Sequence, residues 1–289
     1  MRYAFIKEHL GCWAVSLMAE VLAVSVSGFY DWLKRGKSER AAEDEKLTEK
    51  IVMFHCGSRC TYGSPRIHRD LKAAGHKVGR KRVARLMRAA GIRGKAKKKY
   101  KTTTRSKHSR PKAENLVQQN FEVASPDTLW ASDLTYIPTG EGWLYLAVTL
   151  DLFSRKVVGW AFSERLTDDL TLAALTMATR QRPDSAGLVH HSDQGTQYAS
   201  KAFRAELDAK GIAPSMSGKG NAYDNAVVES FFATLKTEEV ENANYETRQQ
   251  AKTSIFSYLE GFYNAKRRHS SLGYLSPDDF ERVHFTKLA

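Results

Sequence analysis

The spacing of apolar residues divides the chain into a helical N-terminal part and a C-terminal part in which strands alternate with helices. From residue 113 onward, apolar residues alternate with polar ones or form short β-branched runs, which is typical of strands. The pattern predicts strands at 128–138, on both sides of a turn at 151–154, at 188–193 and at 212–216, and helices at 168–182, 200–210, 223–239 and 247–263. This order predicts a mixed α/β sheet covered by helices on both faces, over residues 113–289.

The first 40 residues carry two short amphipathic patterns. Ser25 and Ser27 stand between them, where serine can cap the second helix. Two short helices with a tight join are compatible with a helix-turn-helix, although helical hairpins that bind nothing have the same pattern. The apolar positions of the first pattern are Leu17, Val21, Leu22 and Val24, and those of the second are Phe29, Trp32 and Leu33.

A basic helical unit is predicted over residues 41–94, with two helices that end at Gly75 and Gly91. The second of these helices has Val83, Leu86 and Met87 on its inner side. A linker without apolar periodicity follows at 95–112. The basic residues expected to contact DNA here are Arg80, Lys81, Arg82 and Arg85 of the helix and Lys97, Lys98 and Lys99 of the linker.

The distribution of charge suggests a polyanionic partner. The chain has a formal net charge of +13. Residues 59–112 contain 20 Lys or Arg and one acid, Asp70, so the rest of the chain carries a net charge of −6. A merely solubilising surface would mix acids among the bases. Such a dense positive field is typical of proteins that neutralise the phosphates of DNA.

Composition excludes several other classes. The longest apolar stretch, at 143–162, is interrupted by Asp151, Arg155 and Lys156, so it is not expected to span a bilayer. No secretion signal is apparent, and we expect a cytoplasmic protein. Three cysteines are too few for a disulfide framework. Cys56 and Cys60 have a spacing found in some zinc sites, but no regular second pair follows, which favours free thiols at a helix end.

Three acids fall on separate predicted elements. Asp133 lies within the first strand of the α/β part, where a carboxylate is costly unless a cation or hydrogen bonds meet it. Asp193 ends the fourth strand, which should neighbour the first if the two are parallel. Glu229 lies in the helix at 223–239. Carboxylates without His or Cys partners suit Mg²⁺ or Mn²⁺, and a pair of such ions can promote an in-line phosphodiester displacement.

The helix that carries Glu229 adds two polar side chains on the same face. Asn225 precedes Glu229 by one turn and is expected to support the site. Lys236 follows it by seven residues, which is close to two helical turns. The sequence therefore predicts that Lys236 holds a phosphate of the DNA beside the metal ions.

Four motifs together resemble a known family: WASDLTYIPT, HSDQGTQYAS, GNAYDNAVVESFFATLK and YNAKRRHSSLGYLSP. They are similar to motifs of the DDE transposases of bacterial insertion sequences, specifically the orfB-type subunit. Thirty-five residues separate Asp193 from Glu229, which matches that family, and Lys236 matches its basic residue two turns later. The resemblance covers almost the whole chain, and it identifies Asp133, Asp193 and Glu229 with the catalytic, metal-binding acids of the family.

The resemblance implies a ribonuclease H-like, retroviral-integrase-like catalytic core behind small all-α, helix-turn-helix-like units. It also implies DNA transposition, integration and recombination with Mg²⁺ or Mn²⁺, two ions per active site. Cleavage at an end of the insertion sequence would free a 3′-hydroxyl, which would attack another phosphodiester, typically joining the two ends into a circle. The implied partners are terminal-repeat and target DNA, an upstream orfA product or an orfA–orfB fusion, and at least a second copy of the chain. The implied setting is the bacterial nucleoid.

Two alternatives remain open at this point. A ribonuclease H-like nuclease that only hydrolyses would need the same acids, and a DNA-binding regulator would need only the first 112 residues. Asp151 is a spare acid, which we assign to a turn. His190 and His191 are expected to pack or hydrogen-bond at a strand end, although a place near the metal ions is compatible with the sequence. Arg267 is expected to contact DNA from a polar segment.

Overall fold

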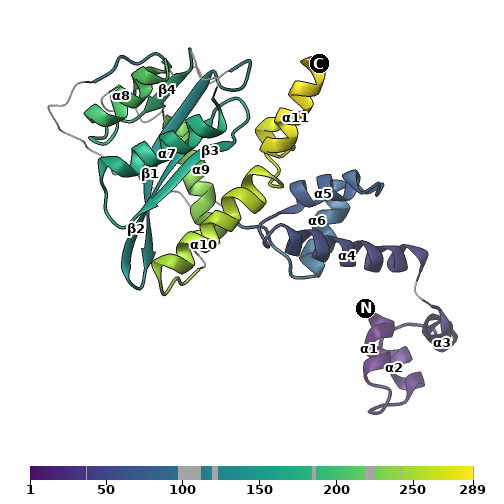
Figure 1. The fold of residues 1–289 in the computed structure, drawn as a ribbon. Helices are drawn as coiled ribbons and strands as arrows, with labels where there is room; N and C mark the ends of the chain where they lie inside the picture. Colours follow the sequence, from purple (N-terminus) through teal and green to yellow (C-terminus); the bar gives the residue numbers. More distant parts are fainter. Residues whose placement is uncertain are drawn as a thin grey trace.

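The N-terminal residues form a small three-helix unit (Figure 1). The computed structural model describes residues 1–36, 38–96, 112–118, 123–183, 187–218, 225–241 and 243–288. Lys97, Lys98, Lys99 and most of the linker expected at 95–112 lie outside these ranges. Helices α1 (Arg2–Glu8), α2 (Val15–Val21) and α3 (Val26–Lys34) enclose a core of Ile6, Met18, Ala19 and Phe29.

The two helices predicted in this unit are present, but the first has a different inner face. The Ser25 hydroxyl caps α3 by accepting a hydrogen bond from the backbone N–H of Gly28 at 3.2 Å, as the sequence predicted. Leu17 and Val21 are 52% and 77% exposed, because α2 buries Met18 and Ala19 instead. The sequence reasoning missed α1, whose Ile6 completes the core.

The basic unit is a second group of three helices, α4 (Glu39–Gly57), α5 (Ser64–Ala73) and α6 (Arg80–Ala89). Gly75 and Gly91 follow α5 and α6 with φ of 84° and 69°, where glycine costs least, so the predicted stops are confirmed. Val83, Leu86 and Met87 are buried as expected. The 19-residue α4 was not predicted as a helix.

A five-stranded mixed sheet forms the centre of the C-terminal part, in the order β3-β2-β1-β4-β5. Its strands are β1 (Leu129–Thr139), β2 (Gly142–Asp151), β3 (Val157–Ser163), β4 (Val189–Ser192) and β5 (Ala213–Met216). The first three are antiparallel neighbours, whereas β4 runs parallel to both β1 and β5. The prediction that the fourth strand lies beside the first is confirmed, and it is this pairing that brings two acids together.

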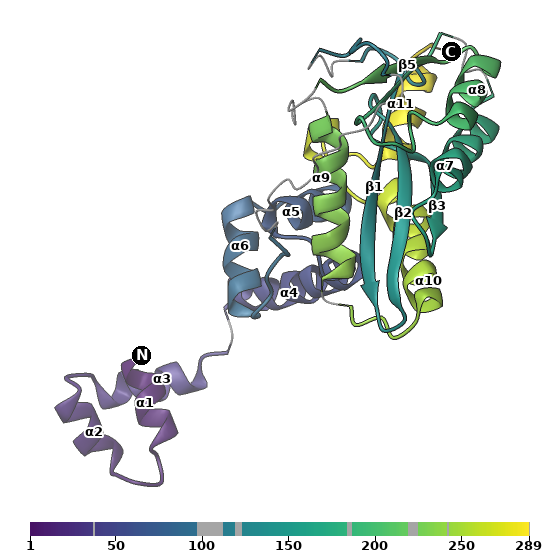
Figure 2. The ribbon, with the colours of Figure 1, turned by 90° about the vertical axis from the view of Figure 1, so that its left-hand side faces the viewer.

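Helices cover both faces of the sheet (Figure 2). Helices α7 (Asp168–Gln181) and α8 (Lys201–Ala209) pack on one face against residues such as Trp130 and Val158. Helices α9 (Ala226–Leu235) and α10 (Arg248–Tyr258) pack on the other, over Ala131, Ile137 and their neighbours. Gly159 permits the close approach of α7, because a Cβ there would lie 2.2 Å from the carbonyl oxygen of Ala174.

Two helices that were predicted as continuous end in π-helical turns. The segment Lys236–Val240 continues α9 with a wider turn that buries Thr237, Glu238 and Val240. The segment Leu259–Asn264 continues α10 in the same way. There the Asn264 side chain accepts a hydrogen bond from the Val157 N–H at 2.9 Å and donates one to the Val157 carbonyl at 3.0 Å, which links α10 to β3.

The basic unit is attached to the C-terminal part by side chains that bridge distant segments. The Arg59 guanidinium pairs with Glu239 at 2.6 Å, and Arg268 pairs with Asp70. A last helix, α11 (Pro277–Leu288), was not predicted; Glu281 on it pairs with Arg182 at 2.7 Å. No helix within the described ranges has both the length and the apolar content needed to cross a bilayer.

Candidate active site

The fold brings the three predicted acids to one region. Asp133 lies in the middle of β1, on the face that α9 covers, since it alternates in step with the buried Ala131 and Ile137. Asp193 comes directly after β4, and the parallel pairing of Ser132 with Ser192 places the two aspartates side by side. Glu229 lies in the first turn of α9 and approaches from above the sheet.

Asp133 is the electrostatic centre of this group. The pKa of the Asp133 carboxyl is raised to about 8, first by burial and then by the negative charges of Asp193 and Glu229. A backbone hydrogen bond from Leu134 and the positive charge of Lys236 act in the opposite direction. Asp193, Glu229 and Lys236 are therefore all close enough to Asp133 to act on its charge, and the two neighbouring acids disfavour a further negative charge there.

Backbone groups hold both aspartates in place. The Asp133 carboxylate accepts a hydrogen bond from the Leu134 N–H at 2.7 Å, and Asp193 accepts one from the Gly195 N–H at 2.8 Å. Gly195 is needed for the second contact, because a Cβ at this position would lie 2.8 Å from an oxygen of Asp193. One oxygen of each carboxylate is thus fixed, which orients the other oxygen.

Glu229 and Lys236 meet the aspartates from α9 and its extension. Burial raises the pKa of Glu229 and lowers the pKa of Lys236, and the charge of Asp133 partly restores the latter. The Lys236 ammonium lies 5.0 Å from the centre of the Tyr136 ring, a cation–π contact that holds it over β1. The expectation that Glu229 and Lys236 face one point agrees with their joint effect on Asp133.

Asn225 is the N-cap residue of α9, but its side chain makes no capping hydrogen bond. It is 7% exposed, and its Oδ1 has no hydrogen-bond partner among the residues that the structure describes. The Tyr198 hydroxyl is likewise buried without a partner there. Burial raises the pKa of Tyr198, as do the charges of Asp133 and Asp193, so this hydroxyl lies near both aspartates.

The composition of the site suits a hard divalent cation. Its donors are carboxylates, and the negative charges of Asp193 and Glu229 repel a negative charge on Asp133. Mg²⁺ or Mn²⁺ would neutralise such a group of negative charges. Within the described part of the chain, no group of three His, Cys, Asp or Glu side chains is close enough to hold a metal ion as it stands. The three acids lie in one region but are not arranged there as a ready-formed metal site.

The remaining candidate acids and histidines have structural roles. Asp151 is fully buried at the end of β2 and accepts hydrogen bonds from the N–H groups of Asp127 and Ser154, at 2.7 and 2.8 Å, which confirms its assignment to a turn. His190 is within 2.8 Å of the Ser132 hydroxyl and His191 is within 2.9 Å of the Ser215 hydroxyl. The pKa of His190 is lowered to about 3, first by burial and then by the charge of His191, so His190 is neutral at pH 7.

The basic residues expected to contact DNA divide into two groups. Arg80 and Lys81 are exposed at the start of α6. Arg82 and Arg85 instead pair with Asp44 of α4, at 2.7 and 2.5 Å. These ion pairs neutralise part of their positive charge within the unit. Arg267 does not fit the expected surface contact: it is 4% exposed and its guanidinium pairs with Glu238 at 2.6 Å.

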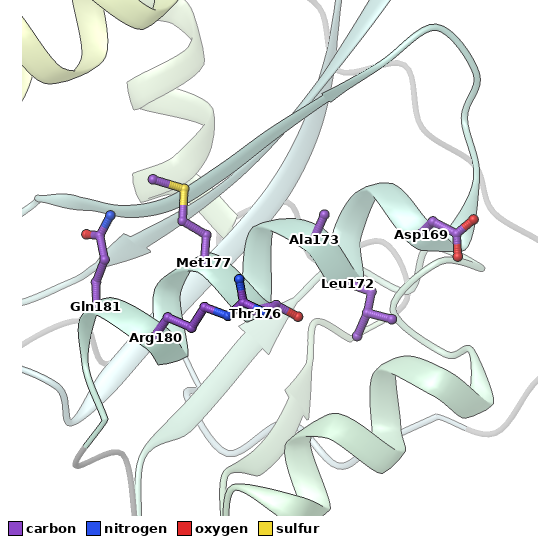
Figure 3. Close-up of a pocket in the computed structure, with 7 residues that line it drawn as sticks. All are labelled: Asp169, Leu172, Ala173, Thr176, Met177, Arg180 and Gln181. Atoms are coloured by element: carbon purple, nitrogen blue, oxygen red, sulfur yellow. The ribbon is translucent and has the colours of Figure 1, made fainter.

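Two cavities among the residues that the structure describes differ in their relation to the predicted site residues. One is lined by seven residues of a single helix, α7, which Figure 3 shows along one side of that helix. It contains none of the predicted site residues. The other has a volume of about 440 Å³ and lies between α5, α9, the turn after β2 and the segment after α10. Arg267 is the one predicted site residue that lines it.

Sequence reasoning missed three residues of this region. Tyr198 follows Asp193 by five residues in the motif HSDQGTQY, and its place in that motif was the available signal. Glu238 and Arg155 carried no such signal. Their importance depends on side chains from segments far away in the sequence, as the pairing of Glu238 with Arg267 illustrates.

Comparison with protein families gives three matches. Residues 123–222 and residues 210–277 match two families that are both described as "Integrase core domain". Residues 42–100 match a family described as "HTH-like domain". The first and second of these ranges together contain all three acids.

Similar curated proteins extend over nearly the whole chain. An uncharacterized 31 kDa protein of insertion element IS600 from Shigella sonnei is 44% identical over 268 residues, covering 92% of this chain and 98% of that protein. The transposase InsF for insertion sequence IS3A from Escherichia coli (strain K12) is 40% identical over 283 residues, covering 97% and 98%.

Similarity to solved structures is weaker. The catalytic core domain of HTLV-2 integrase in complex with magnesium matches at 17% identity with a TM-score of 0.40, covering 54% of this chain and 97% of that one. A simian T-cell lymphotropic virus intasome matches at 15% identity with a TM-score of 0.46, covering 80% and 74%. Similarity at this level carries no function over to this chain.

Proposed function

The chain belongs to the insertion-sequence transposases of the IS3 type, with an integrase core domain and an HTH-like domain, and from this premise we propose that Asp133, Asp193 and Glu229 are its catalytic acids. As a family member it is a DDE-type polynucleotidyl transferase with a ribonuclease H-like core. The observation that carries the proposal is the convergence of the three acids: the parallel pairing of β1 with β4 makes Asp133 and Asp193 neighbours, and Glu229 in the first turn of α9 is close enough to act on Asp133.

The acids are proposed to hold two Mg²⁺ or Mn²⁺ ions. When bound, such ions activate an attacking oxygen and stabilise the leaving oxygen of a phosphodiester displacement. Support comes from the donor set, which consists of carboxylates, and from the repulsion between them. The backbone N–H groups of Leu134 and Gly195 fix one oxygen of each aspartate and direct the other into the site.

Lys236 is proposed to bind the phosphate that reacts. Its ammonium is close enough to Asp133 to affect that carboxyl, and the Tyr136 ring restricts its position. A DNA phosphate held by Lys236 would therefore lie beside the acids. Arg80 and Lys81 are exposed on α6 and are proposed to contact the DNA backbone further away, together with Lys97, Lys98 and Lys99. The buried Asn225, one turn before Glu229, is proposed to support the site.

The proposed reaction has two balanced steps. In the first, water attacks a phosphodiester at an end of the insertion sequence, breaking the bond to the 3′ oxygen and leaving a 3′-hydroxyl and a 5′-phosphate. In the second, this 3′-hydroxyl attacks the phosphorus of another phosphodiester. One P–O bond forms, and the bond to that phosphodiester's own 3′ oxygen breaks, so a new 3′-hydroxyl is released. We propose that the second step joins the two ends of the element, because this is what the resemblance implies.

A protein partner is also proposed. Eighteen large apolar side chains are exposed in the described part of the chain, and nine of them belong to residues 1–36. Phe5, His9 and Trp13 stack in one row, with ring centroids 4.2 and 5.4 Å apart. An apolar surface concentrated on one small unit suits contact with another protein. The upstream orfA product, separate or fused, and a second copy of the chain are the partners that we propose.

Strand cleavage and joining on a labelled duplex with the element's own end, with Mg²⁺ or Mn²⁺, tests this proposal. We expect Glu229→Gln to lower both steps by at least about 1000-fold, because several kcal/mol of charge stabilisation depend on a metal ligand. DNA binding should not change. Glu246→Gln is the matched control, since it removes the same charge from an exposed position in the loop before α10.

The same assay separates the alternatives, with and without the fused upstream partner. Metal-dependent joined products that are lost in Glu229→Gln support the transposase site. Hydrolysis without joining would favour a nuclease. DNA binding with no chemistry in any form would favour a regulator and contradict the proposed roles of the acids.

A further inference from the structure

The cavity beside α9 is lined by three arginines from three separate segments. Arg66 comes from α5, Arg155 from the turn between β2 and β3, and Arg267 from the segment after α10. Its volume of about 440 Å³ exceeds what one or two water molecules need. The basic unit and the catalytic core therefore both contribute positive charge to one cavity.

The positive charge in this cavity is only partly neutralised. Arg267 donates two hydrogen bonds to Glu238, at 2.7 and 2.6 Å, and Arg66 lies 3.7 Å from the same carboxylate. One carboxylate thus faces two guanidinium groups before Arg155 is counted. Burial lowers the pKa of Arg66. The nearby positive charge of Arg267 lowers it further, because two like charges repel each other.

Among the residues that the structure describes, only the charges of Tyr263 and Asp151 favour the charged form of Arg155, and neither forms an ion pair with it. No hydrogen bond or ion pair joins its guanidinium to any residue that the structure describes, and burial lowers its pKa. Asp151 is nearby, but its oxygens accept hydrogen bonds from Asp127 and Ser154. Arg155 also has φ of 60°, in the left-handed region that non-glycine residues rarely adopt. A half-buried, unpaired cation held in a costly backbone conformation is typical of a binding site.

The position of the cavity relative to Glu229 indicates what it would bind. Ala226, Val227, Ser230 and Thr234 of α9 line it, and Ser230 is about 100° around the helix from Glu229. Glu229 and the cavity thus lie on adjacent faces of the same helix. Exposed serines at positions 230, 270 and 271 lie among the lining residues and provide hydroxyl donors at its mouth.

We propose that this cavity binds a backbone phosphate of a DNA strand, with Arg155 as its principal ligand. The inference rests on the proposed function only in taking DNA as the substrate. A strand that reaches the acids at one face of α9 can place a neighbouring phosphate against the other face. Because Arg66 belongs to the basic unit, a phosphate bound here also ties that unit to the catalytic core.

The test is DNA binding by the full chain as a function of salt, in EDTA so that no metal-dependent chemistry occurs. Arg155→Asn removes the charge and keeps a residue that tolerates the left-handed conformation. We expect a loss of affinity of about tenfold and a salt slope smaller by about one, as for the loss of one phosphate contact. Arg155→Lys should keep the slope. Arg204→Asn, on the exposed side of α8, should change neither.

A scan with single neutral methylphosphonates along the duplex locates the contact. One position should weaken binding of the wild type and not of Arg155→Asn. An unchanged slope for Arg155→Asn, or equal sensitivity of both proteins at every position, would overturn the proposal. Inorganic phosphate bound more tightly than about 1 mM through Arg155 without DNA would also overturn it, in favour of a site for small anions. Failure of strand joining with this binding intact would contradict only the proposed catalytic roles.

Discussion

Replacing Asp133 with asparagine is expected to abolish strand cleavage and joining while making the protein more stable at neutral pH. Activity should fall by at least about 1000-fold because the side chain loses its negative charge and a metal-binding oxygen. DNA binding should stay within about twofold, since phosphate contacts by basic residues dominate affinity. Cleavage assays and salt-dependent binding measure these two quantities separately.

The gain in stability follows from the sign of the pKa shift. The pKa of Asp133 rises from 3.8 to about 8 in the fold, first because of burial and then because of Asp193 and Glu229. Between these two pH values the folded protein binds more protons at this site than the unfolded chain, so stability decreases as the pH rises. Asparagine does not titrate. We expect Asp133→Asn to raise the free energy of unfolding at pH 7.5 by about 1–3 kcal/mol.

Denaturant unfolding at pH 5 and at pH 7.5 checks this prediction. The difference between Asp133→Asn and the wild type should be small at the lower pH and larger at the higher one. Adding Mg²⁺ should raise the stability of the wild type and not that of the variant. A variant that is less stable than the wild type at both pH values, or one that still joins DNA ends, would contradict the assignment of Asp133.

Replacing Glu238 with alanine is expected to cause the largest loss of stability. Glu238 is 6% exposed and accepts hydrogen bonds from Arg267 and from the Tyr258 hydroxyl, the latter at 2.8 Å. Burial alone would raise its pKa, but the hydrogen bonds and charge of Arg267 outweigh burial, so the pKa is lowered. Without Glu238, the buried Arg267 charge has lost its partner, which costs about 3–5 kcal/mol.

The control is Arg282→Ala on α11. Its guanidinium pairs with Asp279 at 2.8 Å, but the two side chains are 72% and 42% exposed, so the loss should be at most about 1 kcal/mol. Chemical unfolding of both variants and of the wild type gives the comparison. If Glu238→Ala costs no more than Arg282→Ala, the buried Arg267–Glu238 pair does not stabilise the fold as described.

Local pattern was sufficient for most of the α/β part. Apolar residues alternate with polar ones along β1 and β2, and they follow helical spacing in α7 and α8. These patterns can be read from the sequence because any strand or helix that packs one face on a core must show them. The helix α4 was missed because only Leu47 and Ile51 are buried along its 19 residues. In α11 the available signal was Ser276 before Pro277, a polar cap followed by a proline at the first helical position.

The π-helical turns and the partners of the arginines could not be predicted in this way. The turn at Lys236–Val240 buries Glu238 where Arg267 and Tyr258 can reach it, and those residues come from a different part of the chain. In the same way, the sequence predicted Arg82 as a DNA contact, whereas in the fold its guanidinium pairs with Asp44 at 2.7 Å. A charged residue can be recognised from sequence, but its partner depends on tertiary structure.

The acids themselves could be predicted because each carries a local signal. Asp133 interrupts a strand, Asp193 ends one, and Glu229 shares a helix face with Lys236. The sequence could not predict how the charges of Asp193 and Glu229 change the pKa of Asp133. That effect depends on the parallel pairing of β1 with β4 and on the packing of α9 over that face. These two features determine the unusual pKa of Asp133.

The most direct test of a shared metal site is the metal preference of Asp193→Cys. A thiolate is a poorer ligand than a carboxylate for Mg²⁺, whereas Mn²⁺ is less selective for oxygen. Strand joining by Asp193→Cys should be lost with Mg²⁺ and restored at least in part with Mn²⁺, while the wild type uses both ions. Equal joining by the variant with either ion would contradict direct metal binding by Asp193, and so would no recovery with Mn²⁺ in a variant that still folds and binds DNA.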